Sequence, residues 1–126
     1  MKTASLIARG LLGLIFTVFG LNGFLNFLPM PPPPQPAMAF FGALAATGYM
    51  IPLLFVTQVA GGALLLVGMV PLALVILAPV IVNIVAFHAF LAPAGMPLAI
   101  VVASLALFLA SAHRETYRPL FAAARV

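Results

Sequence analysis

Long apolar runs separated by proline- and glycine-containing breaks dominate this chain. Four runs have lengths that suit membrane-spanning helices, at about 4–28, 50–70, 72–92 and 98–113. A helix needs about 20 predominantly apolar residues to cross the hydrocarbon core of a bilayer. Positions 10–113 contain no Asp, Glu, Lys or Arg, so the last three runs carry no charge, and the first carries only Arg9 near its start. The pattern predicts an all-α integral membrane fold, with four spans in a single transmembrane domain.

Prolines and glycines mark the places where the predicted spans end. A proline-rich stretch, 29–36, follows the first run, and proline cannot continue a helix because it lacks an amide hydrogen. Residues 37–47 resemble a short helix that is too short to span, and we expect it at the membrane surface. Tight turns near Pro71 and at 93–97 join the other spans and make neighbouring helices antiparallel. The predicted fold is therefore a four-helix antiparallel bundle with a short interfacial helix between spans one and two.

The distribution of charge predicts the orientation in the membrane. Lys2 and Arg9 flank the start of the first run, and three arginines lie in a tail at 114–126. Positive residues favour the cytoplasmic side, so we expect both termini in the cytoplasm, as an even number of crossings requires. The first run is too long for the apolar core of a secretory signal peptide, so we interpret it as a retained span. The predicted location is a bacterial inner (cytoplasmic) membrane.

Composition narrows the chemistry that is available to the chain. Charged residues make up 5% of the chain, there is no cysteine, and Glu115 is the only residue with a carboxylate side chain. Thiol chemistry and iron–sulfur clusters are thereby excluded, and no metal site is expected. The net charge of +4 resides in two short tails without interleaved aromatics. We therefore expect the lipid bilayer, and not nucleic acid, as the partner of these tails.

Five strongly polar side chains interrupt the apolar runs, and the predicted topology gathers them in the outer half of the bundle. They come from three spans and are Asn22, Asn26, Gln58, Asn83 and His88. One interpretation is an outward-facing polar pocket that binds a quinone or another lipid-like small molecule, although no cofactor is certain. The alternative is that these groups bond across helices, each contributing about 0.6–2 kcal/mol. The histidine has the same two interpretations, since an imidazole can relay protons or simply pack.

Glycine spacing predicts where helices approach closely. Gly13 and Gly20 lie seven residues apart in the first run, as do Gly61 and Gly68 in the second. Each pair can line one stripe at which two backbones meet, and such stripes hold helices together in lipid. We interpret them as packing surfaces within the chain; the alternative is a contact between copies in a homo-oligomer.

Five short segments resemble a known family. They are RGLLGLIF at 9–16, FGLNGF at 19–24, GYMIPL at 48–53, VAGGALLL at 59–66 and APVIVNIVAFH at 78–88. With them the chain resembles the DoxX-like integral membrane proteins over nearly its whole length, from about residue 6 to residue 120. The resemblance implies a four-helix bundle. It also implies an accessory or ligand-binding subunit of a redox-linked membrane system, because the family is associated with a quinol oxidase.

One departure from the family pattern bears on activity. Many members carry a glutamate where Gln58 stands in this chain. Glutamine cannot carry a proton, so the resemblance favours binding or structural support over catalysis by this chain alone. Two alternatives stay open: a quinone-reactive oxidoreductase subunit, and a structural small subunit of a larger membrane protein complex.

Overall fold

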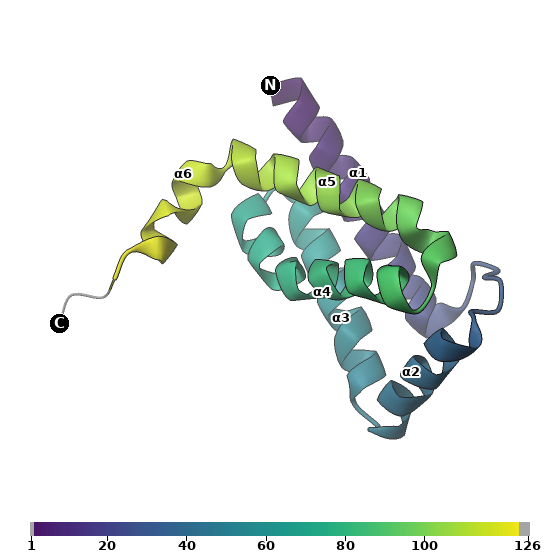
Figure 1. The fold of residues 1–126 in the computed structure, drawn as a ribbon. Coiled ribbons are helices and arrows are strands. Elements are labelled where there is room, and N and C mark those ends of the chain that lie inside the picture. The colour runs from purple at the N-terminus through teal and green to yellow at the C-terminus, as the bar shows by residue number, and fades with distance from the viewer. Residues whose placement is uncertain (1, 124–126) are drawn as a thin grey trace.

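The computed structural model describes residues 2–123, and most of that range is helical (Figure 1). The elements are α1 (Lys2–Leu25), α2 (Gln35–Ala46), α3 (Met50–Leu66), α4 (Val70–Phe90), a 3-10 turn (Pro93–Gly95), α5 (Met96–Ala112), α6 (Arg114–Tyr117) and a second 3-10 turn (Arg118–Phe121). No strand occurs within residues 2–123, which confirms the predicted all-α class. Of the predicted tail at 114–126, residues 124–126 lie outside the described range.

Helix lengths support three crossings outright and a fourth only in combination. By length and composition α1, α4 and the segment Pro93–Ala112 can each cross a membrane. Helix α3 has 17 residues, which is roughly 26 Å of rise and falls short of a core of about 30 Å. Helices α2 and α3 meet at a bend of 98° and together make one candidate span. Residues 2–123 therefore contain three helices that are long and apolar enough to cross a membrane, or up to four if this bent pair is one span.

Four helices share one apolar core. Helix α1 contacts α3 and α5, and α4 contacts the same two helices, so the four form a closed ring. Figure 1 shows α4 and α5 side by side, crossing over α1 and α3. The largest fully buried side chains come from all four: Leu12, Phe16, Leu65, Leu77 and Leu109. The core is thus contributed by segments that are far apart in the sequence.

Glycines bring α1 and α3 into close contact. A Cβ added at Gly62 would lie 2.6 Å from the Thr17 amide nitrogen and 2.9 Å from the Gly13 carbonyl oxygen. Small residues of this kind let helix backbones approach in lipid, where the hydrophobic effect does not drive association. The predicted packing role of Gly13 is confirmed. The predicted stripe through Gly61 and Gly68 is wrong, because α3 ends at Leu66 and leaves Gly68 in the following turn with φ 95°.

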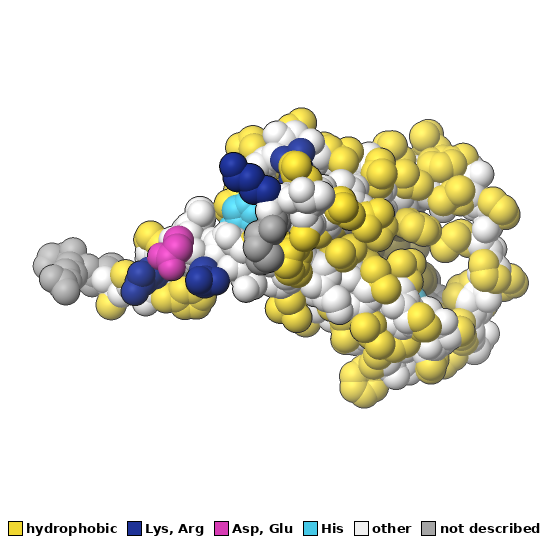
Figure 2. All heavy atoms as spheres, turned by 90° about the horizontal axis from the view of Figure 1, so that it is seen from above, with side chains coloured by type: hydrophobic (Ala, Val, Ile, Leu, Met, Phe, Trp, Pro, Cys, Tyr) yellow, Lys and Arg dark blue, Asp and Glu magenta, His cyan; other side chains and the backbone are white. Residues whose placement is uncertain are grey.

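The charged residues gather at one end of the molecule. The Arg9 guanidinium on α1 lies beside Gly68 in the α3–α4 turn, because a Cβ there would sit 3.1 Å from Arg9 Nη1. At the same turn the Tyr117 hydroxyl, from the tail, donates a hydrogen bond to the Pro71 carbonyl oxygen at 2.8 Å. Figure 2 shows the basic side chains on one side and a largely hydrophobic surface over the rest of the visible face.

Candidate functional site

Two of the predicted pocket residues end helix α1. Asn26 has φ 51°, and its amide donates to the Asn22 carbonyl oxygen at 2.9 Å. This is a left-handed helix cap, for which asparagine is the best residue after glycine. The buried Asn22 side chain accepts a hydrogen bond from the Leu28 amide, with Oδ1 at 2.7 Å. Both side-chain positions are therefore explained by the turn that leaves α1.

His88 fastens the turn between α4 and α5. Its Nδ1 lies 3.1 Å from the Ala92 carbonyl oxygen, and because a carbonyl only accepts, Nδ1 carries the proton in this bond. The ring packs over Gly95, where an added Cβ would collide with the imidazole. Its other face meets Phe87 edge-on, with ring centroids 5.1 Å apart. This geometry gives His88 a structural role, in which only the Nδ1 atom takes part in the bond to Ala92.

The other two predicted pocket residues, Gln58 and Asn83, differ in their surroundings. Gln58 is 9% exposed and faces α1, where its Cβ would lie 3.2 Å from a Cβ added at Gly20. Asn83 instead lies on the exposed side of α4, next to Val82, which is 70% exposed. The shared pocket of five polar residues stays a prediction, and the contacts favour the alternative of separate structural roles for Asn22 and His88.

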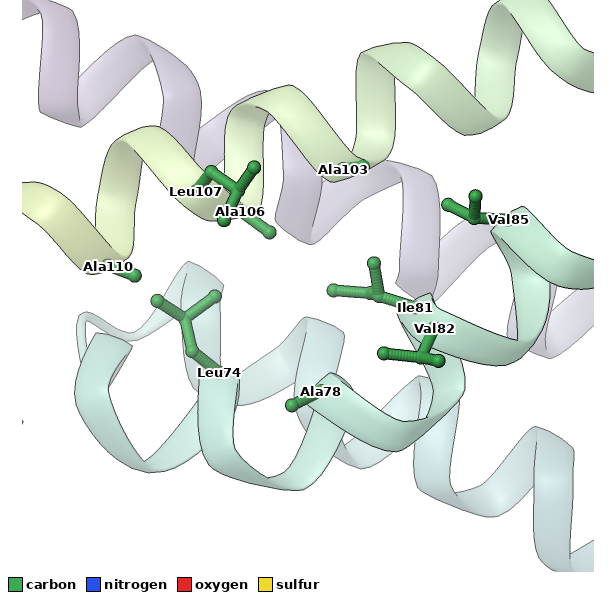
Figure 3. Close-up of a pocket in the computed structure, with 9 residues that line it drawn as sticks. All are labelled: Leu74, Ala78, Ile81, Val82, Val85, Ala103, Ala106, Leu107 and Ala110. Carbon is green, nitrogen blue, oxygen red and sulfur yellow. The ribbon is translucent and has the colours of Figure 1, made fainter. Parts of the chain in front are cut away.

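Two cavities lie elsewhere, between α4 and α5, and Figure 3 shows the side chains that line the first. One has a volume of about 390 Å³ and is lined only by apolar side chains: Leu74, Ala78, Ile81, Val82, Val85, Ala103, Ala106, Leu107 and Ala110. A second, of about 500 Å³, shares four of these and continues toward the tail along Val75, Ser111, Arg114, Tyr117 and Phe121. We call the two together the α4–α5 groove. Both volumes fall within the range of about 300–1,000 Å³ that is usual for small-molecule sites.

Small side chains create the groove. Ala103, Ala106 and Ala110 are spaced by three and four residues, which places them on one face of α5. Ala78 lies opposite on α4 and lines both cavities, and Figure 3 shows the alanines and Leu74 facing the same space. The polar residues of the sequence do not indicate this site, because its only sequence signal is a set of alanines at helical spacing.

One end of the groove is polar and held in place. The Tyr117 hydroxyl bonds the Pro71 carbonyl oxygen, which ties the tail to the beginning of α4. Burial raises the pKa of Tyr117 above its ordinary value of 10.0. Arg114 lines the same end; its side chain is 77% exposed, and its Nε lies 4.0 Å from a Glu115 oxygen. Glu115 is also paired with Arg118 at 3.3 Å, so two guanidinium groups share one carboxylate.

The groove can bind a molecule but offers little chemistry. Its walls lack any acid, base or nucleophile until the polar end is reached. Across residues 2–123, no cluster of three or more His, Cys, Asp or Glu side chains could hold a metal ion. The chain matches no protein-family model, no curated protein and no solved structure. Its function must therefore be argued from these residues, and the DoxX-like resemblance stays an expectation.

Proposed function

We propose that the protein is a small integral membrane protein that crosses the bilayer four times, with α2 and α3 together forming one bent span. Large apolar side chains on the outside of the helices support this: Leu14 on α1 is 53% exposed, Val56 on α3 is 55% exposed and Leu107 on α5 is 71% exposed. A contiguous apolar surface of this kind marks contact with lipid or with another protein. The charged end then lies at the cytoplasmic headgroups of a bacterial inner membrane.

Within that membrane, the protein acts as an accessory or ligand-binding subunit of a redox-linked system and is not catalytic alone. The observation that carries this proposal is the α4–α5 groove, which provides a binding volume without a reactive group in its apolar part. The DoxX-like resemblance supplies the redox-linked setting. A quinone-reactive subunit is the weaker candidate, because a quinone head requires hydrogen-bond donors at its carbonyl oxygens and the apolar walls supply none.

Cysteine labelling tests the topology with no background, because the chain contains no cysteine. Pro33→Cys lies in the loop between α1 and α2, and Thr116→Cys lies in the tail. In intact bacterial cells, a membrane-impermeant maleimide should label position 33 at once and position 116 only after permeabilisation. Labelling of both positions from the same side would contradict four crossings, and reversed labelling would invert the orientation.

The accessory role is tested by gentle solubilisation from the native membrane. Native mass spectrometry of the tagged full-length protein should find it with larger membrane protein partners. Recovery of the chain as an isolated species that itself oxidises a quinol would contradict the proposal. Loss of the partner complex on deletion of the chain, without any effect of groove variants, would favour the purely structural subunit.

A further inference from the structure

We propose that the α4–α5 groove holds one acyl chain of an anionic phospholipid from the cytoplasmic leaflet, with the lipid phosphate against Arg114. The inference rests on the proposed membrane insertion and names the ligand class for the proposed binding role. The groove is apolar along its length and basic at one end, which matches one acyl chain attached to an anionic headgroup.

The length of the groove fits one leaflet. It runs along α5 from Ala103 to the polar end next to Arg114. Between Ala103 and Ala112 the helix rises roughly 14 Å, which is close to half of a hydrocarbon core of about 30 Å. A chain whose headgroup lies at Arg114 would therefore reach the midplane of the bilayer where the groove closes at Val85 and Ala103.

The polar end has positive charge to spare. Arg114 and Arg118 are both paired with Glu115, at 4.0 Å and 3.3 Å, and all three side chains are at least 73% exposed. One carboxylate thus balances only one of the two guanidinium groups. A guanidinium binds phosphate oxygens in a planar, two-bond geometry that suits this position. The Ser111 side chain, one turn before Arg114, lines the same end and adds a hydroxyl.

The tail keeps that charge in place at the mouth of the groove. Tyr117 and Phe121 line the second cavity, and the Tyr117 bond to Pro71 anchors their segment on α4. Three alanines on α5 and Ala78 on α4 line the apolar cavity of about 390 Å³, so a hydrocarbon chain has room between the two helices.

Lipid retention by the purified full-length protein provides the test. The protein is exchanged into a neutral detergent, incubated with phosphatidylglycerol or with phosphatidylcholine, and examined by native mass spectrometry. The expected result is one tightly held phosphatidylglycerol and weaker retention of phosphatidylcholine. Arg114→Gln should weaken phosphatidylglycerol retention roughly fivefold, the effect of about one basic residue near a lipid surface. Ala78→Phe, which fills the groove, should abolish retention of both lipids.

Two matched variants control for charge and bulk. Arg118→Gln removes an arginine that is paired with the same carboxylate but does not line the groove. Ala60→Phe adds the same bulk at an exposed position of α3. Ala60→Phe should retain phosphatidylglycerol like the unmodified protein. Arg118→Gln lowers the local charge but keeps the guanidinium that lines the groove, so it should retain more phosphatidylglycerol than Arg114→Gln does. If Ala78→Phe melts at a lower temperature than Ala60→Phe, Ala106→Leu replaces it as the filling variant.

Several outcomes would overturn the inference. Equal retention by Arg114→Gln and Arg118→Gln, equal affinity for the two lipids, or undiminished retention by a folded filling variant would each do so. Loss of a dimer on filling, with no change in lipid, would assign the groove to a second copy of the chain. Normal cysteine topology alongside any of these results would leave the proposed membrane insertion standing, whereas abnormal topology would remove both the insertion and the lipid site.

Discussion

Replacing Gly62 with alanine should separate α1 from α3. The added Cβ would meet the Thr17 side-chain oxygen at 2.5 Å and the Thr17 amide nitrogen at 2.6 Å. The hydroxyl can rotate away, but the amide nitrogen belongs to a helix backbone and cannot move alone. The Gly13 carbonyl oxygen, at 2.9 Å from the same Cβ, blocks escape along the other direction. The two helices must therefore part.

The size of the effect follows from these distances. Ordinary van der Waals contact begins at 3.4 Å, so the Cβ and the Thr17 nitrogen need roughly 0.8 Å of extra separation. A gap of that size forfeits about a quarter to a half of each dispersion contact along the seam, and overpacking of this kind costs about 1–3 kcal/mol. Alanine recovers up to about 1 kcal/mol through its helix propensity. The free energy of unfolding should fall by about 1–2 kcal/mol.

A melting experiment measures the change. In a mild detergent, followed by circular dichroism, Gly62→Ala should lower the melting temperature by roughly 4–8 °C, given the usual scaling for a chain of this size. Gly42→Ala is the matched control, because it is also within a helix and nothing lies within 4 Å of its added Cβ. The control should melt at the original temperature or higher. A Gly62→Ala protein as stable as the control would refute the close packing of α1 on α3.

Three further changes test individual polar groups. Thr17→Val should raise the melting temperature by a few degrees, because the buried hydroxyl has no hydrogen-bond partner within residues 2–123 and such a group costs about 1–3 kcal/mol. Asn26→Gly should be tolerated, whereas Asn26→Val should lose about 1–2 kcal/mol at φ 51° in a melting experiment; equal stability of the two would contradict a left-handed cap. Tyr117→Phe removes the bond to Pro71 and should raise hydrogen exchange in 114–121. Since burial raises the Tyr117 pKa above 10.0, the docking of the unmodified tail should be complete below pH 10 and lost as the pH rises through the elevated value. The phenylalanine variant should lack this alkaline transition, and its presence there would assign it to another group.

Helices were predictable from this sequence because lipid-length apolar runs and proline breaks are strong signals. The proline-rich stretch correctly separated α1 from α2, and the turn near Pro71 correctly preceded α4. The end of the second predicted span was not predictable to the residue. Gly68 continues the apolar run in sequence, yet its positive φ ends the helix in a turn that Arg9 covers. A local glycine cap decided that boundary, because the Met69 amide donates to the Leu64 carbonyl oxygen at 2.9 Å and the Gly68 amide donates to the Leu65 carbonyl oxygen at 3.2 Å; hydropathy alone carries no information about such a cap.

The site was less predictable for a related physical reason. Polar side chains in an apolar run are costly to bury, so they are natural candidates for ligand contacts. Here Asn22 and His88 each form a hydrogen bond with a backbone group at a helix end. Every helix end leaves backbone groups that need partners, and no sequence motif marks which polar side chain will supply one. The α4–α5 groove instead depends on how two helices are placed against each other. Periodicity put Ala103 and Ala106 on one face, but only the fold placed Ala78 opposite them.

Under the proposed insertion and lipid binding, recognition depends on shape along the helices and on charge only at their ends. Inside a bilayer, alanine faces would give a ligand room without adding a polar group that would need its own partner. At the headgroup level, an exposed guanidinium such as that of Arg114 can meet a phosphate without any rearrangement of the helices. The tail unites the two regions because Tyr117 is anchored on Pro71 at the beginning of α4. If the tail is released, the apolar part of the groove keeps its alanines but loses its basic end, so lipid-chain binding should persist while the preference for anionic headgroups disappears.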